Sequence, residues 1–227
     1  SLDLSNFDTS KVTSMTSMFN TCSALTSLDV SNFDTSNVTI MHSMFYGCSS
    51  LTSLDVSSFD TSKVTIMQNM FTNCNNLKQL KGNFVLNNVN CAYMFRECSK
   101  GPDLSEFKMS GTITDTNYMF TSFGFQNTPL ATSLDLSDIA LAEGCAIVEY
   151  TFFRCTVYDI YPFTNINTSC HLANISELSS EVVLRFLNNL ANAPEGVTWT
   201  LTLGNTLINK LTEEQIAIAV NKGWTVA

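Results

Sequence analysis

The chain has 227 residues, of which 44% are apolar and 14% are charged, and its formal net charge is −9. These values describe a globular protein with a sizeable core, in which Ser, Thr and Asn take many of the surface places that charged residues usually fill. An acidic chain without a Lys/Arg cluster repels phosphate, which argues against nucleic acid and anionic membrane as partners. No signal peptide is visible, and no apolar run reaches the roughly 20 residues of a membrane span.

The first part of the chain repeats one sequence three times with a period of 26 residues. The copies are SLDLSNFDTSKVTSMTSMFNTCSALT (1–26), SLDVSNFDTSNVTIMHSMFYGCSSLT (27–52) and SLDVSSFDTSKVTIMQNMFTNCNNLK (53–78). A period of 20–50 residues is typical of a stacked solenoid, in which neighbouring units share one core and present a long surface. The chain begins inside a repeat, so we expect the natural protein to continue upstream, where any signal or anchor would lie.

Each repeat divides into a strand and a second segment with a different period. Leu25-x-x-Leu28-x-Val30 matches the strand pattern of a leucine-rich repeat. Val38, Met41, Met44 and Cys48 then step by three and four, which predicts a short helix or two helical turns. Between them, Asp34-Thr35-Ser36 forms a corner whose side chains can accept hydrogen bonds from the amides that open the following turn. The sequence therefore predicts an α/β fold, with one parallel sheet face and short helices or turns on the other.

Two motifs follow the repeats into the later chain. An Asp-apolar-x-x-apolar motif occurs at Asp29, Asp103, Asp135 and Asp159. A Met-Phe pair begins at Met18, Met44, Met70, Met94 and Met119, and Phe152-Phe153 is its altered form. Residues 107–150 hold the largest insertions, which in a solenoid form loops on one face, often a binding face. Drift without function would leave the same pattern.

The C-terminal part has longer helical patterns. Ser179-Ser180-Glu181 opens an amphipathic helix that continues to Leu190, and Thr212 to Gln215 form a capping box before a second helix that Gly223 ends. The strands Trp199–Leu201 and Trp224–Val226 recur at 25 residues, so we expect two helical repeats that cap the C-terminus. The prediction is one domain, 1–227, with regular repeats in 1–106, irregular repeats in 107–174 and cap repeats in 175–227.

The repeat resembles the 26-residue bacterial surface-protein repeat of the BspA-type leucine-rich-repeat family. The resemblance is carried by Met41, Met44-Phe45, Cys48, Leu51, Leu54-Asp55-Val56, Phe59-Asp60-Thr61-Ser62 and their period mates. The ending LTEEQIAIAVNKGWTV (211–226) is similar to the final repeat of such proteins from gut bacteria. The resemblance implies a secreted or surface-attached protein that binds host or matrix proteins, and it brings no catalytic residues.

The spacing of the eight cysteines does not predict a metal site, because no CxxC motif occurs. Cys22, Cys48, Cys74 and Cys98 share one repeat position, which favours a buried column of free thiols, although bridges between neighbouring rungs are not excluded by distance. Cys91, Cys145, Cys155 and Cys170 share no period. We expect no metal and no cofactor.

Two rows of aspartates follow the repeats. Asp3, Asp29 and Asp55, continued by Asp135 and Asp159, form an outward row that Lys81 interrupts. This row is open to three interpretations: a contact for a basic protein surface, a cation site with too few oxygen ligands for calcium, or plain solvated surface. Asp8, Asp34 and Asp60 each precede Thr-Ser at a corner, and we expect them to be structural.

Exposed aromatic residues are the better candidates for binding. Five of the six tyrosines, Tyr93, Tyr118, Tyr150, Tyr158 and Tyr161, follow residue 90, whereas Tyr46 precedes it, and Tyr is enriched at protein interfaces. Phe123 and Phe125 flank Gly124 in an insertion and could belong to a surface or to the core. Ordinary packing remains the alternative for all of them. His42 and the Cys170-His171 neighbours offer no convincing catalytic pair.

We therefore expect a non-enzymatic extracellular or cell-surface protein, a lipoprotein candidate, that mediates protein–protein adhesion with an extracellular protein partner. The candidate binding residues are Asp29, Asp55, Asp135, Asp159, Tyr118, Phe123 and Phe125. One alternative is a structural spacer or stalk. The second is a carbohydrate-binding module, which needs a Tyr or Trp platform in a groove; Trp199 and Trp224 are instead expected in the core.

Overall fold

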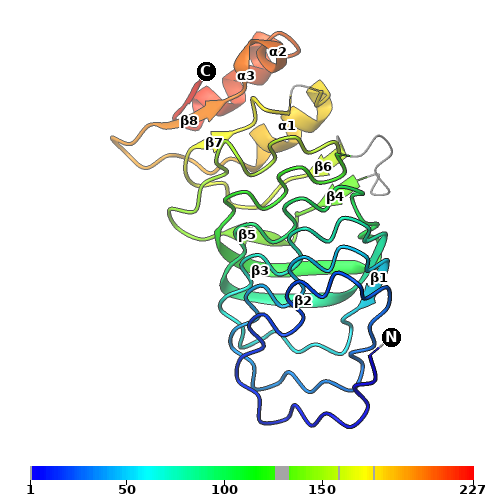
Figure 1. Cartoon of the computed structure of the whole chain (residues 1–227). Coiled ribbons are helices and arrows are strands. Elements are labelled where there is room, and N and C mark those ends of the chain that lie inside the picture. Colours follow the sequence, from blue (N-terminus) through cyan, green and yellow to red (C-terminus); the bar gives the residue numbers. More distant parts are fainter. Residues whose placement is uncertain (1, 126–132, 158, 176) are drawn as a thin grey trace.

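The computed structural model describes residues 2–125, 133–157, 159–175 and 177–227. It shows a mixed α/β chain with parallel sheets and few helices, in which the first residues and the helices lie at opposite ends (Figure 1). The elements are β1 (Ser53–Asp55), β2 (Gln79–Asn90), β3 (Phe107–Asp115), β4 (Ser133–Asp135), β5 (Ile139–Leu141), β6 (Asp159–Tyr161), β7 (Cys170–His171), α1 (Ser180–Asn189), β8 (Trp199–Thr202), α2 (Gly204–Ile208), α3 (Glu213–Asn221) and β9 (Trp224–Val226). Tyr158, one of the predicted aromatic candidates, lies outside the described residues.

The strands pair in parallel with segments about one repeat away in the sequence. The strand order is β1-β2-β3-β5 in one sheet, β4-β6 in a second and β7-β8-β9 in a third. Isolated parallel bridges join Ser14 to Ile40, Ile40 to Ile66 and Ile66 to Asn90, so the first repeats pair in the same sense. Like positions of neighbouring repeats therefore lie side by side, as the 26-residue period predicts.

The predicted short helix of each early repeat is absent, because turns take its place. Among the described residues no α-helix precedes Ser180. In the second repeat the amides of Met44 and Cys48 donate within the segment, to the carbonyls of Met41 and Phe45, whereas the amide of Phe45 donates to Met70 of the next repeat, at 3.0 Å. We call this series of turns, residues 14–22 and its counterparts in later repeats, the turn column.

Left-handed residues explain why the turn column does not become a helix. Residues with φ between 55° and 68° recur at two positions of the turn segments. The first position holds Ser17, Ser43, Asn69, Tyr93 and Tyr118, and the second holds Thr21, Gly47, Asn73, Glu97, Ser122 and Arg154. An α-helix of L-residues needs negative φ throughout, so a left-handed residue every four positions redirects alternate amides to the neighbouring repeat.

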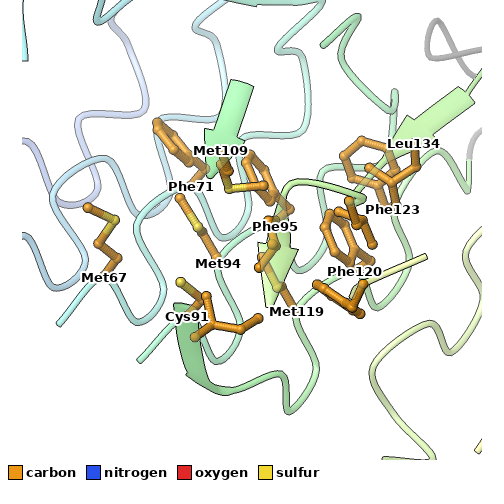
Figure 2. Close-up of a cluster of buried hydrophobic side chains, with 14 of the residues drawn as sticks. Met67, Phe71, Cys91, Met94, Phe95, Met109, Met119, Phe120, Phe123 and Leu134 are labelled. Atoms are coloured by element: carbon orange, nitrogen blue, oxygen red, sulfur yellow. The ribbon is translucent and has the colours of Figure 1, made fainter. Parts of the chain in front are cut away.

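The core is a continuous column of stacked aromatic rings. Phe19, Phe45, Phe71, Phe95, Phe120 and Phe152 follow one another with centroids 5.4 to 5.7 Å apart and nearly parallel planes. Figure 2 shows part of this column, with Met94 and Met119 beside it. Phe33 and Cys48, on which the stacked interpretation depends, are both buried.

The later motifs shift in register where the repeats change length. Phe152, not Phe153, stacks on Phe120, so Thr151-Phe152 takes the place of the Met-Phe pair. Asp103 pairs with Gln79, which itself pairs with Ser53, and Asp159 pairs with Ser133. Both aspartates thus lie in the column of the serine of Ser-Leu-Asp, and Asp159 is therefore not in the outward aspartate row in which it was predicted.

The C-terminal elements agree with the sequence at their boundaries. Ser179 caps α1 by accepting from the amide of Val182, and Thr212 and Gln215 form the predicted capping box of α3. Trp224 is buried, whereas Trp199 is only half-buried. The predicted capping role is not supported: Val197 and Val220 are 44% and 55% exposed, so this segment lacks the polar outer face of a cap.

Candidate functional site

Three tyrosines from successive repeats stack on the surface of the turn column. The ring centroids of Tyr93 and Tyr118 are 4.8 Å apart and those of Tyr118 and Tyr150 are 4.7 Å apart, with planes within 5° of parallel. Tyr150 is 38% exposed, and Tyr93 and Tyr118 are half-buried. No hydroxyl group of these three tyrosines forms a hydrogen bond within the described residues. The column thus presents ring edges and unpaired hydroxyl groups to the outside.

Two arginines and two phenylalanines extend this surface. The guanidinium of Arg96 lies 5.9 Å from the ring centroids of Tyr93 and Tyr118. Phe153 packs edge-on against Tyr150, and the guanidinium of Arg154 lies 5.4 Å from Phe153 and 5.5 Å from Phe125. We name this set the aromatic stripe: Tyr93, Arg96, Tyr118, Phe125, Tyr150, Phe153 and Arg154.

The backbone conformation of the stripe is unusual for tyrosine. Tyr93 and Tyr118 have φ of 62° and 56°, at the position that Ser17, Ser43 and Asn69 occupy in the regular repeats. A bulky side chain in the left-handed region costs free energy, whereas Asn and Gly adopt it readily. Backbone strain of this kind concentrates at functional sites, so the two tyrosines are stronger binding candidates than composition alone indicates.

The predicted aromatic residues separate into surface and core. Tyr118 is the middle ring of the stripe, and Phe125 is 53% exposed beneath Arg154. Phe123 is fully buried and packs edge-on against Phe95 and Phe120, which makes it a core residue and removes it from the candidate surface (Figure 2). Of the two phenylalanines that flank Gly124, only Phe125 therefore lies on the surface.

The outward aspartates make local hydrogen bonds. One oxygen of Asp29, Asp55 and Asp135 accepts from the amide of the residue two positions on, at 2.9 to 3.0 Å. Hydrogen bonds from Ser31 and Ser57 lower the pKa of Asp29 and of Asp55, which are both exposed. These carboxylates therefore stabilise turns, in the way predicted only for Asp34 and its period mates.

The row does not continue to Asp159 as predicted. Lys81 stands opposite Asp55 in the register and forms an ion pair with Glu106 at 2.7 Å. Asp159 instead forms an ion pair with Arg185 of α1 at 2.6 Å, and the register places Tyr161 opposite Asp135. The structure thus places Asp29 and Asp55 beside each other. Asp135 and Asp159 do not share a row, because Asp159 stands opposite Ser133 and Asp135 stands opposite Tyr161.

A groove lies where the outward row would have continued. It has a volume of about 270 Å³, and its walls include Asp103, Lys108, Met109, Asp135 and Asp138. Among the described residues, no group of three or more His, Cys, Asp or Glu could hold a metal ion. Because Asp103 and Asp135 already accept from the amides of Ser105 and Ser137, the groove offers fewer free acceptors than its acidic side chains indicate.

The cysteines are packing residues. All eight are free, and seven are buried, whereas Cys22 is half-buried. The thiols of Cys48, Cys74 and Cys98 donate to the carbonyls of Phe19, Phe45 and Phe71 at 3.1 to 3.2 Å. Burial raises the pKa of Cys48 to about 11 and that of Cys98 to about 12. Such thiols are poor nucleophiles and poor metal ligands at neutral pH.

Sequence reasoning did not single out Tyr93, Arg96, Tyr150, Phe153 and Arg154 as members of one surface. The available signal was the alignment of Tyr93 and Tyr118 with Ser17, Ser43 and Asn69 at one repeat position. The alignment of Tyr150 needs the register of Thr151-Phe152, which only the structure provides.

Comparison with models of protein families gives a match to the first part of the chain. Residues 1–107 match a family model described as "Mycoplasma protein of unknown function, DUF285". The match covers the three regular repeats and ends at the first residue of β3. Comparison with curated proteins and with solved structures gave no match. In the part of the chain that the structure describes, no helix is both long and apolar enough to cross a membrane.

Proposed function

We propose that this chain is a leucine-rich-repeat solenoid of the BspA type that acts, without catalysis, as an extracellular or cell-surface adhesion protein. It binds another protein through the aromatic stripe. The observation that supports this proposal most directly concerns Tyr93 and Tyr118. Both have a left-handed backbone conformation, and their partly exposed rings stack on each other beside Arg96. Tyr and Arg are the residues that most often dominate the binding energy of protein interfaces.

The parallel pairing of neighbouring repeats supports the solenoid part of the proposal. Main-chain amides of one repeat donate to carbonyls of the next throughout the turn column, for example from Phe19 to Met44 and from Phe45 to Met70. Each repeat then contributes one rung to a surface that changes gradually along its length. The stripe occupies the rungs where small polar residues give way to tyrosines.

A structural spacer is the second candidate, and the regular repeats favour it. Asp29 and Asp55 make the same local hydrogen bond in successive copies, and Thr35 and Thr61 make the same hydrogen bond to the following repeat, which is what a uniform rod requires. The stripe argues against a spacer alone, since a rod needs no strained tyrosines on its surface.

A carbohydrate-binding module has less support. Sugar platforms use the open face of an aromatic ring, whereas the rings of Tyr93, Tyr118 and Tyr150 stack on one another and cover much of their faces. The exposed edges and hydroxyl groups suit protein contacts better.

Binding to immobilised extracellular-matrix proteins and mucins, measured by biolayer interferometry, tests the adhesion proposal. Tyr118→Asn should weaken a binding signal at least about tenfold, because it removes the central ring of the stripe. Asn is the residue that the third repeat uses at this position, so the backbone accepts it.

Tyr46→Asn is the matched control. Tyr46 lies outside the stripe, and the first repeat has Asn20 at its position. Binding that survives Tyr46→Asn and is lost in Tyr118→Asn supports the proposal. Equal binding by both variants would show that the stripe is not the contact, and no binding to any surface by the unaltered chain would favour the spacer.

A further inference from the structure

The two arginines of the aromatic stripe have no anionic partner within the chain. The ion pairs of the described residues are Lys81–Glu106, Arg185–Asp159 and Arg185–Glu181. All Asp and Glu residues lie in the described part, so no carboxylate elsewhere in the chain is left to pair with Arg96 or Arg154. Neither guanidinium donates a hydrogen bond to a described residue, and Nε of Arg96 is a buried donor without an acceptor.

These arginines contrast with the third one of the chain. Arg185 makes two ion pairs, to Asp159 at 2.6 Å and to Glu181 at 2.9 Å, and also lies over Tyr161. In this acidic chain, carboxylates are more common than cations, so an unpaired Arg is the less expected outcome. Glu97 and Glu149 are sequence neighbours of the stripe, yet neither is within ion-pair distance of Arg96 or Arg154.

The positions of Arg96 and Arg154 define a spaced pair of cationic sites. Arg96 contacts the stripe at Tyr93 and Tyr118, and Arg154 contacts it at Phe153, on the rung of Tyr150, and at Phe125, on the rung of Tyr118. Rungs of a parallel ladder are about 4.8 Å apart, so the two guanidinium groups lie about one rung apart along the stacking direction. An aromatic surface, formed by Tyr118, Tyr150 and Phe153, lies between them.

We propose that the aromatic stripe binds an acidic peptide segment, whose carboxylates pair with Arg96 and Arg154 and whose apolar side chains pack on the tyrosine edges between them. The proposal rests on the adhesion function above and specifies the chemistry of its partner. Arginine forms bidentate, charge-assisted hydrogen bonds with carboxylates while its plane remains stacked on aromatic rings. At an ionic strength of about 0.15 M the Debye length is about 8 Å, so the net charge of the rest of the protein is largely screened at this contact.

Fluorescence anisotropy with short labelled peptides tests the proposal on the full chain. The probes are a peptide in which Glu and Phe alternate, the same peptide with Gln in place of Glu, and the same peptide with Lys. We expect only the Glu peptide to bind, with an affinity that falls as salt is added. Arg96→Gln and Arg154→Gln should each weaken it about tenfold, the loss expected for one charge-assisted contact.

Lys63→Gln is the control, because Lys63 is an exposed cation of the third repeat outside the stripe and should leave binding unchanged. Thermal unfolding of each variant checks that the fold persists. The proposal is wrong if the Glu and Gln peptides bind equally, if the Arg variants bind as the unaltered chain does, or if heparin binds through Arg96 and Arg154 while the Glu peptide does not. If Tyr118→Asn loses matrix binding but the Glu peptide does not bind the unaltered chain, only this inference is wrong, and the adhesion function is still supported.

Discussion

Buried threonines connect the corners of neighbouring repeats. Oγ1 of Thr35 donates to the carbonyl of Asp60 at 3.0 Å and accepts from the amide of Asp60 at 2.7 Å. Thr9 makes the same pair of bonds to Asp34, and Thr61 makes it to Val85. The sequence predicts hydrogen bonds from this corner to its own turn, but only a repeat period combined with stacking can indicate bonds to the next corner.

Thr35→Val tests the role of this threonine. Valine has nearly the same shape but removes the partner of the part-buried amide and carbonyl of Asp60. Since an unsatisfied buried group costs about 1–3 kcal/mol and these two are only part-buried, we expect the free energy of unfolding to fall by about 2 kcal/mol. Chemical denaturation provides the measurement, and Thr39→Val, at an exposed threonine, should change stability by less than about 0.5 kcal/mol.

Gly111 is required by the close approach of two strands. A Cβ atom on Gly111 would lie 2.1 Å from the carbonyl oxygen of Leu86 on β2, a distance that backbone atoms cannot accept. We expect Gly111→Ala to lower the midpoint of thermal unfolding far more than Gly144→Ala. Gly144 also has positive φ but has nothing within 4 Å of the added atom, so it isolates the steric clash from the backbone strain. Equal shifts in the two variants would contradict the tight pairing of β2 and β3.

At the scale of elements, the sequence predicts the parallel pairing but not the turn column. Steps of three and four residues place Met41, Met44 and Cys48 on one side of a helix, and the same steps place them on one side of a series of turns. The distinguishing signal is the small or polar residue at left-handed positions, such as Asn69 and Gly47. The hydrophobic period alone cannot separate these two structures.

The C-terminal helices were more predictable because their ends carry local signals. Ser179 and Thr212 are capping residues whose hydrogen bonds depend only on neighbours in the sequence. The register after residue 100 was not predictable in the same way, since Asp103 and Asp159 carry the motif but pair two positions away from its usual column. Insertions shift the pairing without changing the motif, which is why Asp159 was wrongly assigned to the outward row.

The buried free cysteines give a test of how tightly the elements pack. Seven of the eight thiols are buried, and burial raises the pKa of Cys145 and of Cys155 to about 12, so these thiols remain protonated at neutral pH. With a thiol reagent such as Ellman's reagent at pH 8, we expect only half-buried Cys22 to react in the native protein, and all eight thiols to react in denaturant. Cys22→Ser should remove the native reaction. Fast reaction of several thiols in native Cys22→Ser would contradict this tight packing.

For the whole molecule, aspartates at repeated corners couple stability to pH. Hydrogen bonds from serines two residues on lower the pKa of Asp3, Asp8, Asp29, Asp34, Asp55 and Asp60. A lowered pKa in the folded state adds stability above the unfolded pKa of about 3.9, and this stability is lost as pH falls through the folded pKa. The midpoint of thermal unfolding should therefore decrease below about pH 4.

The triple variant Asp8→Asn, Asp34→Asn, Asp60→Asn tests the origin of this effect. Asparagine keeps an acceptor oxygen for the serine amides but cannot titrate, so the decrease in the unfolding midpoint between pH 5 and pH 2 should be smaller than in the unaltered chain. An identical decrease would show that other carboxylates control acid stability.

The turn column also has an electrical direction. The amide of Phe19 donates to the carbonyl of Met44. The peptide group that contains this carbonyl donates in turn, through the amide of Phe45, to the carbonyl of Met70. The series continues through the amides of Phe71, Phe95 and Phe120 and ends at the carbonyl of Thr151. Peptide dipoles linked head to tail in this way add along the stacking direction and polarise one another, as they do in an α-helix. The carbonyl ends point toward residues 14–20 and the amide ends point toward the helices. A longer stack would therefore have a stronger electrostatic field, which favours cations at its first coil and anions at its last.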